Sequence, residues 1–131
     1  MVSTDTAVHV AVLTVAVASL FVLDAVFAGS TGAVPQAATF LVLNGLVLAG
    51  AHFLLAVLGR DGLVPVDARW RFVGAVAVLL ALGTVGILTD PVSLGPVTTD
   101  ELLAALGVLT MLGYLVSEAR AGYRESVEGT A

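Results

Sequence analysis

The sequence contains no cysteine and no lysine, and charged residues of either sign are scarce. The missing thiols exclude disulfide bonds, cysteine-ligated zinc and cysteine-ligated iron–sulfur clusters. Five arginines make up the whole basic complement, and with ten acidic residues they give a net charge of −5. A basic surface for nucleic acid is therefore absent, and we expect no nucleic-acid partner.

The low charge also argues against a soluble fold. Only 11% of the 131 residues are charged and 59% are hydrophobic, whereas charged residues make up roughly 25% of ordinary soluble domains. Between Ala7 and Leu58, Asp24 is the only formally charged side chain. Helices of a soluble bundle need a polar face, which these segments lack. The composition predicts an all-α integral membrane protein surrounded by the lipid bilayer.

Four segments are long and apolar enough to be considered as membrane spans. A span needs about 20 apolar residues, and the predicted ranges are 7–28, 35–58, 70–89 and 102–117. Pro35 suits the first turn of the second helix, and Asp67 is a plausible N-cap of the third. Thr98 and Glu101 have the spacing of a capping box before the fourth. We predict one domain, residues 1–131, folded as an up-down-up-down four-helix bundle.

The arginines predict the orientation of the chain. They all fall on one side of the predicted membrane: Arg60, Arg69, Arg71, Arg120 and Arg124. Loops 29–36 and 90–101, on the other side, contain no basic residue. Under the positive-inside rule, both termini are cytoplasmic in a multi-pass protein of the cell membrane. Arg60, Arg69, Trp70 and Arg71 are predicted interfacial anchors whose guanidinium groups meet lipid phosphates.

Small residues recur at helical spacing in three of the predicted spans, which favours close helix packing in lipid. The three sets are Gly45, Ala49 and Ala56 beside His52; Gly74, Ala77, Ala81 and Thr84; and Thr110, Gly113 and Ser117. We expect these faces to form the contacts of a compact bundle. A substrate cavity lined by small residues is the alternative.

Three polar side chains fall inside the predicted spans: Asp24, Asn44 and His52. Asp24 lies roughly 6 Å below the outer interface at 1.5 Å per residue, which favours a structural, interfacial carboxylate over a proton relay. Asn44 is expected to make an interhelical hydrogen bond. At 100° per residue, the side chains of Asn44 and His52 point in directions about 80° apart around the helix axis.

His52 is the residue on which the functional alternatives differ. The simpler interpretation is a neutral imidazole hydrogen-bonded across the bundle. The alternative is a cofactor-binding His52, a haem or metal ligand with His9 as a second imidazole at a different depth. Nucleotide-binding, serine-hydrolase and zinc-protease motifs are missing. We therefore expect no catalytic residue, no metal site and no bound cofactor.

Two stretches resemble the small four-helix membrane proteins grouped as DoxX-like, or neighbouring uncharacterised families. They are Asn44 to Gly59, similar to the second helix of those proteins, and Pro96 to Leu102, similar to the start of their last helix. The resemblance implies an accessory role beside respiratory or redox enzymes. Separately, the acidic loops and the missing lysine resemble haloarchaeal composition.

These observations favour a non-enzymatic structural or accessory membrane protein that packs against itself or another membrane protein. Such a protein could belong to a cellular membrane complex or to a viral envelope. A redox-associated or haem-binding subunit using His52 is the second hypothesis. A small transporter is the third, and it would need charged residues at mid-membrane, which the spans nearly lack.

Overall fold

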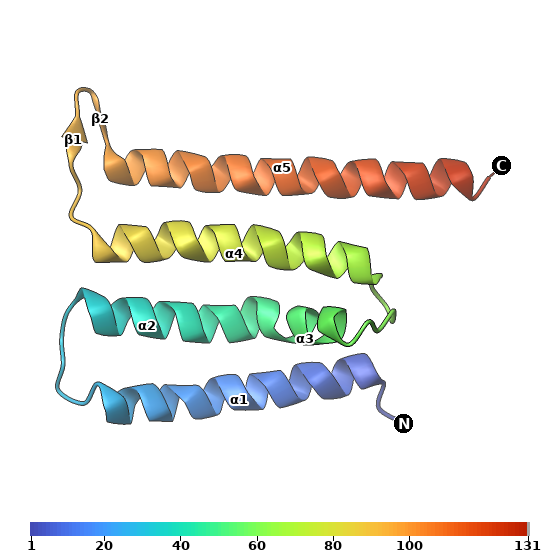
Figure 1. Cartoon of the computed structure of the whole chain (residues 1–131), viewed down its shortest axis with the longest axis horizontal. Coiled ribbons are helices and arrows are strands. Elements are labelled where there is room, and N and C mark those ends of the chain that lie inside the picture. The colour runs from blue at the N-terminus through green and yellow to red at the C-terminus, as the bar shows by residue number, and fades with distance from the viewer. Residues whose placement is uncertain (131) are drawn as a thin grey trace.

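The computed structural model describes residues 1–130. Its long helices are rods that lie side by side (Figure 1). The elements in chain order are α1 (Thr4–Val26), α2 (Ala33–Asn44), the π-helix η1 (Gly45–Gly50), α3 (Ala51–Val57), α4 (Val66–Leu88), β1 (Ser93–Leu94), β2 (Val97–Thr98) and α5 (Thr99–Glu128). Because α2, η1 and α3 form one rod, four helices are long and apolar enough to cross a membrane. The predicted all-α membrane bundle is confirmed.

The four rods alternate in direction, so the molecule has two distinct ends (Figure 1). Both chain termini and the loop between α3 and α4 lie at one end, here called the terminal end. The loop between α1 and α2 and the two-residue strands β1 and β2 lie at the other, here called the hairpin end. All five arginines lie in the loop and helix segments at the terminal end.

The helix boundaries follow from local capping. The predicted capping box is confirmed, because the Thr98 hydroxyl accepts from the Glu101 amide while the Glu101 carboxylate accepts from the Thr98 amide. The predicted N-cap role of Asp67 is wrong. Pro65 holds the N-cap position of α4, and the Asp61 carboxylate accepts from the Val66 amide at 3.0 Å.

The last helix is longer than the predicted 102–117. α5 has 30 residues and extends about 45 Å, whereas the 23 residues of α1 extend about 35 Å. The sequence estimate counted only the apolar stretch, but the polar residues after Ser117 continue the helix. In Figure 1 the C-terminal part of α5 therefore projects beyond its neighbours at the terminal end.

Neighbouring helices pack in chain order. α1 packs against α2, η1 and α3, while α4 packs against this rod on one side and against α5 on the other. Two glycines allow close approaches between these helices. An added Cβ at Gly50 would lie 2.7 Å from the Val12 side chain, and one at Gly83 would lie 2.6 Å from the Phe40 ring.

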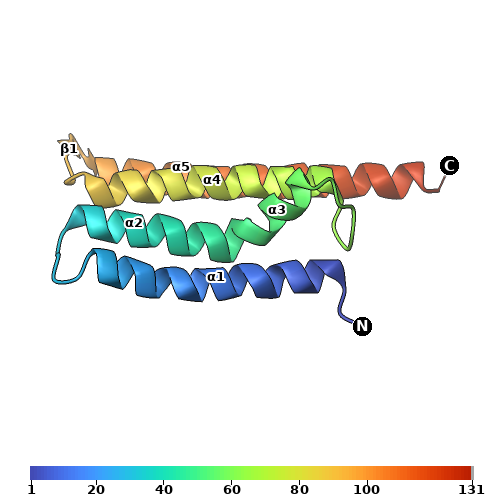
Figure 2. The ribbon, with the colours of Figure 1, turned by 60° about the horizontal axis from the view of Figure 1, so that its bottom comes forward.

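The π-helix bends the second rod. Figure 2 shows α3 leaving the axis of α2 at η1, as expected where a π-turn and glycines interrupt regular helix geometry. The first residues of α3 are thereby aimed at α4, and Leu55 becomes completely buried. This bend brings His52, the second residue of α3, to the side chain of Arg69 on α4.

The small-residue faces are only partly those predicted. In the second rod, Ala56 is buried and Gly45 faces Leu80 of α4. On α4 the predicted face is wrong, because Gly74, Ala77 and Ala81 are all exposed. The inward face of α4 carries larger side chains, and the close approach to α2 is made at Gly83 instead. On α5, Thr110 and Ser117 are half-buried and Gly113 is exposed.

Candidate functional site

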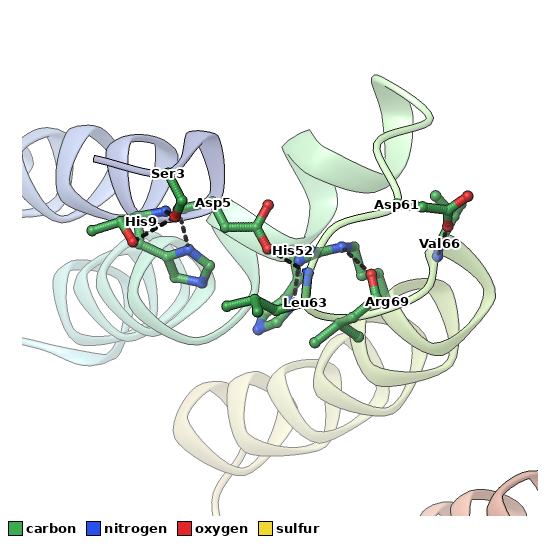
Figure 3. Close-up of polar contacts among 10 residues, drawn as sticks. Ser3, Asp5, His9, His52, Asp61, Leu63, Val66 and Arg69 are labelled. Atoms are coloured by element: carbon green, nitrogen blue, oxygen red, sulfur yellow. Dashed lines mark hydrogen bonds and ion pairs between the residues drawn. The ribbon is translucent and has the colours of Figure 1, made fainter. Parts of the chain in front are cut away.

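Four polar residues from three helices meet at the terminal end, and we call them the Asp5–Arg69 cluster. They are Asp5 and His9 of α1, His52 of α3 and Arg69 of α4. Figure 3 shows the side chains of Asp5, His52 and Arg69 directed toward one another. Only His9 and His52 were predicted to be functional partners from the sequence.

Arg69 is the centre of the cluster, and its side chain is completely buried. Nη2 donates to Asp5 Oδ2 at 2.7 Å, Nη1 donates to His52 Nδ1 at 3.2 Å, and Nε donates to the Val64 carbonyl at 3.1 Å. A buried guanidinium is stable only when its donors and its charge are matched, and each of its three nitrogens has a partner here. The predicted contact with lipid phosphate is therefore wrong for Arg69.

Asp5 connects the start of α1 to the loop between α3 and α4. Besides Arg69, its Oδ2 accepts from the Leu63 amide at 3.3 Å. An added Cβ at Gly62 would lie 2.6 Å from Asp5 Oδ1, so the glycine lets the loop pass against the carboxylate. Asp5 also sits in the first turn of α1, where the helix dipole favours negative charge. Arg69 lies near the start of α4, where the helix dipole disfavours positive charge. Its guanidinium therefore requires the carboxylate of Asp5.

The hydrogen bonds fix roles for the two imidazoles. Arginine only donates, so His52 Nδ1 accepts and the proton of this neutral ring lies on Nε2. His9 Nδ1 donates to the Asp5 carbonyl at 2.7 Å. The two rings touch edge to face, with centroids 5.3 Å apart. The hydrogen bond of His52 across the bundle is confirmed, and the two histidines, predicted at different depths, have their rings in contact.

This arrangement does not fit a haem held between the two histidines. Such ligation needs the imidazoles on opposite faces of the macrocycle, whereas these rings are in contact and His52 also packs against Phe72 with centroids 4.9 Å apart. The Arg69 guanidinium on His52 Nδ1 would in addition repel a metal cation. Within residues 1–130, no group of three or more His, Asp or Glu side chains is placed to hold a metal ion.

The other predicted anchors lie at the same end. Arg71 pairs with Glu118 of α5 through an Nε–Oε1 contact of 2.7 Å, with both side chains about one-third exposed. Trp70 is 44% exposed and packs edge to face against Phe53. Arg60 is exposed in the loop after α3. Contact of these three residues with lipid headgroups stays a prediction.

The remaining intramembrane polar residues lie in the other half of the molecule. Asp24 and Asn44 line an open groove of about 690 Å³ between α1 and α2. The Asn44 amide donates to the Phe40 carbonyl of its own helix at 2.8 Å, so the predicted interhelical hydrogen bond is wrong. Asp24 is exposed and takes no part in the two ion pairs found in residues 1–130. Asp24 and Asn44 therefore make fewer polar contacts than the residues of the Asp5–Arg69 cluster.

Sequence reasoning missed Asp5 and Glu118, the two acidic partners of the arginines. Asp5 precedes the predicted first span and Glu118 follows the predicted last one, so neither was considered among the polar residues of the spans. A usable signal was present. In an up-down-up-down bundle, the starts of the first and third helices meet at one end. The first turns of α1 carry one acidic residue, Asp5, and those of α4 carry two arginines, Arg69 and Arg71.

The chain matches no family model, no curated protein and no solved structure. The resemblance to DoxX-like proteins therefore stays a prediction.

Proposed function

We propose that this multi-pass membrane protein is a non-enzymatic structural or accessory component, and that it assembles with further copies of itself through α4. The observation that carries the proposal is the outward face of that helix. Gly74, Ala77 and Ala81 are exposed in a row at helical spacing, and an added Cβ at Gly74 meets nothing within 4 Å. In lipid, rows of small residues let helix backbones approach closely, and this is a main source of helix association.

The polar features support a structural role for the protein. In the Asp5–Arg69 cluster the hydrogen bonds and the ion pair of Asp5 and Arg69 join α1, α3, α4 and a loop, which is what a structural site requires. A transporter would need its charged groups near mid-membrane, but Arg69 is the fourth residue of α4, roughly 5 Å from its start. The haem-binding alternative lacks a fitting ligand pair. A purified protein without a Soret band would agree with the structural proposal.

Cysteine crosslinking tests self-assembly directly, because the native chain has no cysteine. We expect Ala81→Cys to form disulfide-linked dimers in native membranes under mild oxidation. Ala105→Cys, an exposed site on α5, is the matched control and should stay monomeric. Added to Ala81→Cys, Ala77→Leu on the same face should lower the crosslinked fraction while leaving the monomer as stable as the native protein. Equal crosslinking at both sites, or none at either, would contradict assembly through α4.

The orientation is part of the same proposal. All arginines at the terminal end imply that this end is cytoplasmic. In intact cells, an impermeant thiol reagent should label Ser93→Cys at the hairpin end and should not label Asp61→Cys in the loop between α3 and α4. The reverse pattern would overturn the orientation, and labelling of both would contradict the number of spans.

A further inference from the structure

A second group of arginines lies on the outside of the bundle at the terminal end. α4 and α5 form a groove of about 340 Å³ there. Its walls include three guanidinium-bearing residues and three small residues: Arg71, Arg120 and Arg124, with Gly113, Ser117 and Ala121. The proposed assembly face of α4 does not include any of these residues.

The spacing of residues on α5 explains the groove. Gly113, Ser117 and Ala121 follow one another at intervals of four, so their small side chains form a shallow trough along one helix face. Arg120 and Arg124 are also four apart and border this trough. An added Cβ at Gly113 meets nothing within 4 Å, so the floor of the groove is open. Arg71 closes the groove from the side of α4.

The charge of the groove is not balanced by the protein. Arg71 is paired with Glu118, but neither Arg120 nor Arg124 takes part in an ion pair within residues 1–130. The groove therefore carries an excess of positive charge, in a chain whose net charge is −5. Guanidinium groups bind phosphate oxygens through paired N–H donors, which is the recognition that such a groove offers.

The depth of the groove identifies the source of the phosphate. The apolar stretch of α5 ends at Ser117, so we place Gly113 within hydrocarbon, and Arg120 and Arg124 one to two turns beyond its edge. A ligand filling the whole groove must have an anionic head at the level of the headgroups and an apolar part beside Gly113. A phospholipid has this form, and a free phosphate ion does not.

We propose that this groove is a binding site for one anionic phospholipid, whose phosphate lies between Arg120 and Arg124 and whose acyl chain lies along Gly113. A zwitterionic lipid binds less well because its own ammonium group offsets the charge that the arginines recognise. We expect each arginine that contacts the lipid phosphate to contribute about fivefold in affinity, which is the effect of one basic residue at an anionic membrane surface. The site adds a specific lipid ligand to the general bilayer contact of the helices.

The test uses the full chain in detergent, with lipid retention measured by native mass spectrometry. We expect phosphatidylglycerol to be retained in preference to phosphatidylcholine, with one lipid per chain bound most tightly. Arg120→Gln and Arg124→Gln should each lower retention about fivefold. Gly113→Leu should lower it by filling the groove floor, because no protein atom lies near to be displaced. Thermal unfolding in detergent, unchanged in each variant, would show that the fold is intact.

Arg60→Gln is the matched control, since it removes one positive charge from an exposed site at the same end, outside the groove. It should leave retention unchanged. An equal loss of lipid retention in Arg60→Gln and Arg120→Gln would mean that lipid is attracted by the general surface charge. That result would overturn the proposed site. Lack of preference between the two lipids would overturn it too. Displacement of phosphatidylglycerol by millimolar inorganic phosphate would show that the groove recognises a free anion and not a lipid.

Discussion

Arg69 and Arg71 lie two residues apart on α4, and each makes an ion pair of 2.7 Å with a carboxylate of another helix. Their surroundings differ completely. The Arg69 side chain is 0% exposed and its partner Asp5 is 13% exposed, whereas Arg71 and Glu118 are 35% and 31% exposed. Arg69 also bonds His52 and a loop carbonyl, while Arg71 bonds Glu118 alone among the described residues.

The comparison shows that the length of an ion pair does not measure its importance. Around Arg69, water and lipid headgroups are excluded, so a missing partner leaves a buried charge without compensation. Around Arg71, water or a headgroup can replace the carboxylate, so the pair contributes little. The buried Asp5–Arg69 pair, here called the inner pair, determines how α1, α3 and α4 meet. The partly exposed Arg71–Glu118 pair, here called the outer pair, adjusts the contact between α4 and α5.

The largest effect is expected from Arg69→Met, which keeps the length of the side chain and removes its donors. Asp5, His52 and the Val64 carbonyl would lose their common partner, and breaking such a buried pair costs about 3–5 kcal/mol. The free energy of unfolding in mixed detergent micelles would measure this loss. Arg71→Met is the control, and a similar loss in both variants would mean that the two pairs are equivalent after all.

The same comparison can be made with smaller expected effects by adding a methyl group at the glycine beside each ion pair. In Gly62→Ala the new methyl group would lie 2.6 Å from the carboxylate of Asp5, which Arg69 and Leu63 hold in place, so we expect overpacking that costs about 1–3 kcal/mol. Gly113→Ala, beside the outer pair, meets nothing within 4 Å and should be neutral. The midpoints of thermal unfolding would test both. A neutral Gly62→Ala would show that Asp5 can move away freely.

The smallest effect is expected from Glu118→Gln. The amide can still accept from Arg71, and partly exposed pairs contribute about 0–1 kcal/mol. Whatever stabilisation the native pair provides should fall as the salt concentration rises, because solvent screens exposed charges. Unfolding measured at low and high ionic strength would check this. Two results would contradict this: a fall in the free energy of unfolding of more than about 1 kcal/mol in Glu118→Gln, or a fall that does not depend on salt. Either result would show that the outer pair behaves like the buried inner pair.

The sequence predicted the parts of this fold that depend on composition along one helix. Four spans, their alternation and the capping box at Thr98 all follow from local patterns. The Asp5–Arg69 cluster does not, because it depends on which faces of three helices meet and on the bend at η1. A regular helix was assumed through Gly45–Gly50, and periodicity alone gives no sign of a π-turn there. The inward face of α4 was missed since large side chains, not small ones, fill it.

Asp5 and Arg69 are separated by 64 residues of the 131, so the carboxylate is synthesised and reaches the membrane well before its partner. The carboxylate of Asp5 is synthesised first, and it lies at the membrane edge while the second rod (α2, η1 and α3) and then α4 are inserted. The arginine of α4 can be desolvated only when that carboxylate is beside it. We therefore expect correct insertion of the third span to depend on the first few residues. An affinity tag fused before Met1 should disturb biogenesis, whereas one placed after the projecting end of α5 should be harmless.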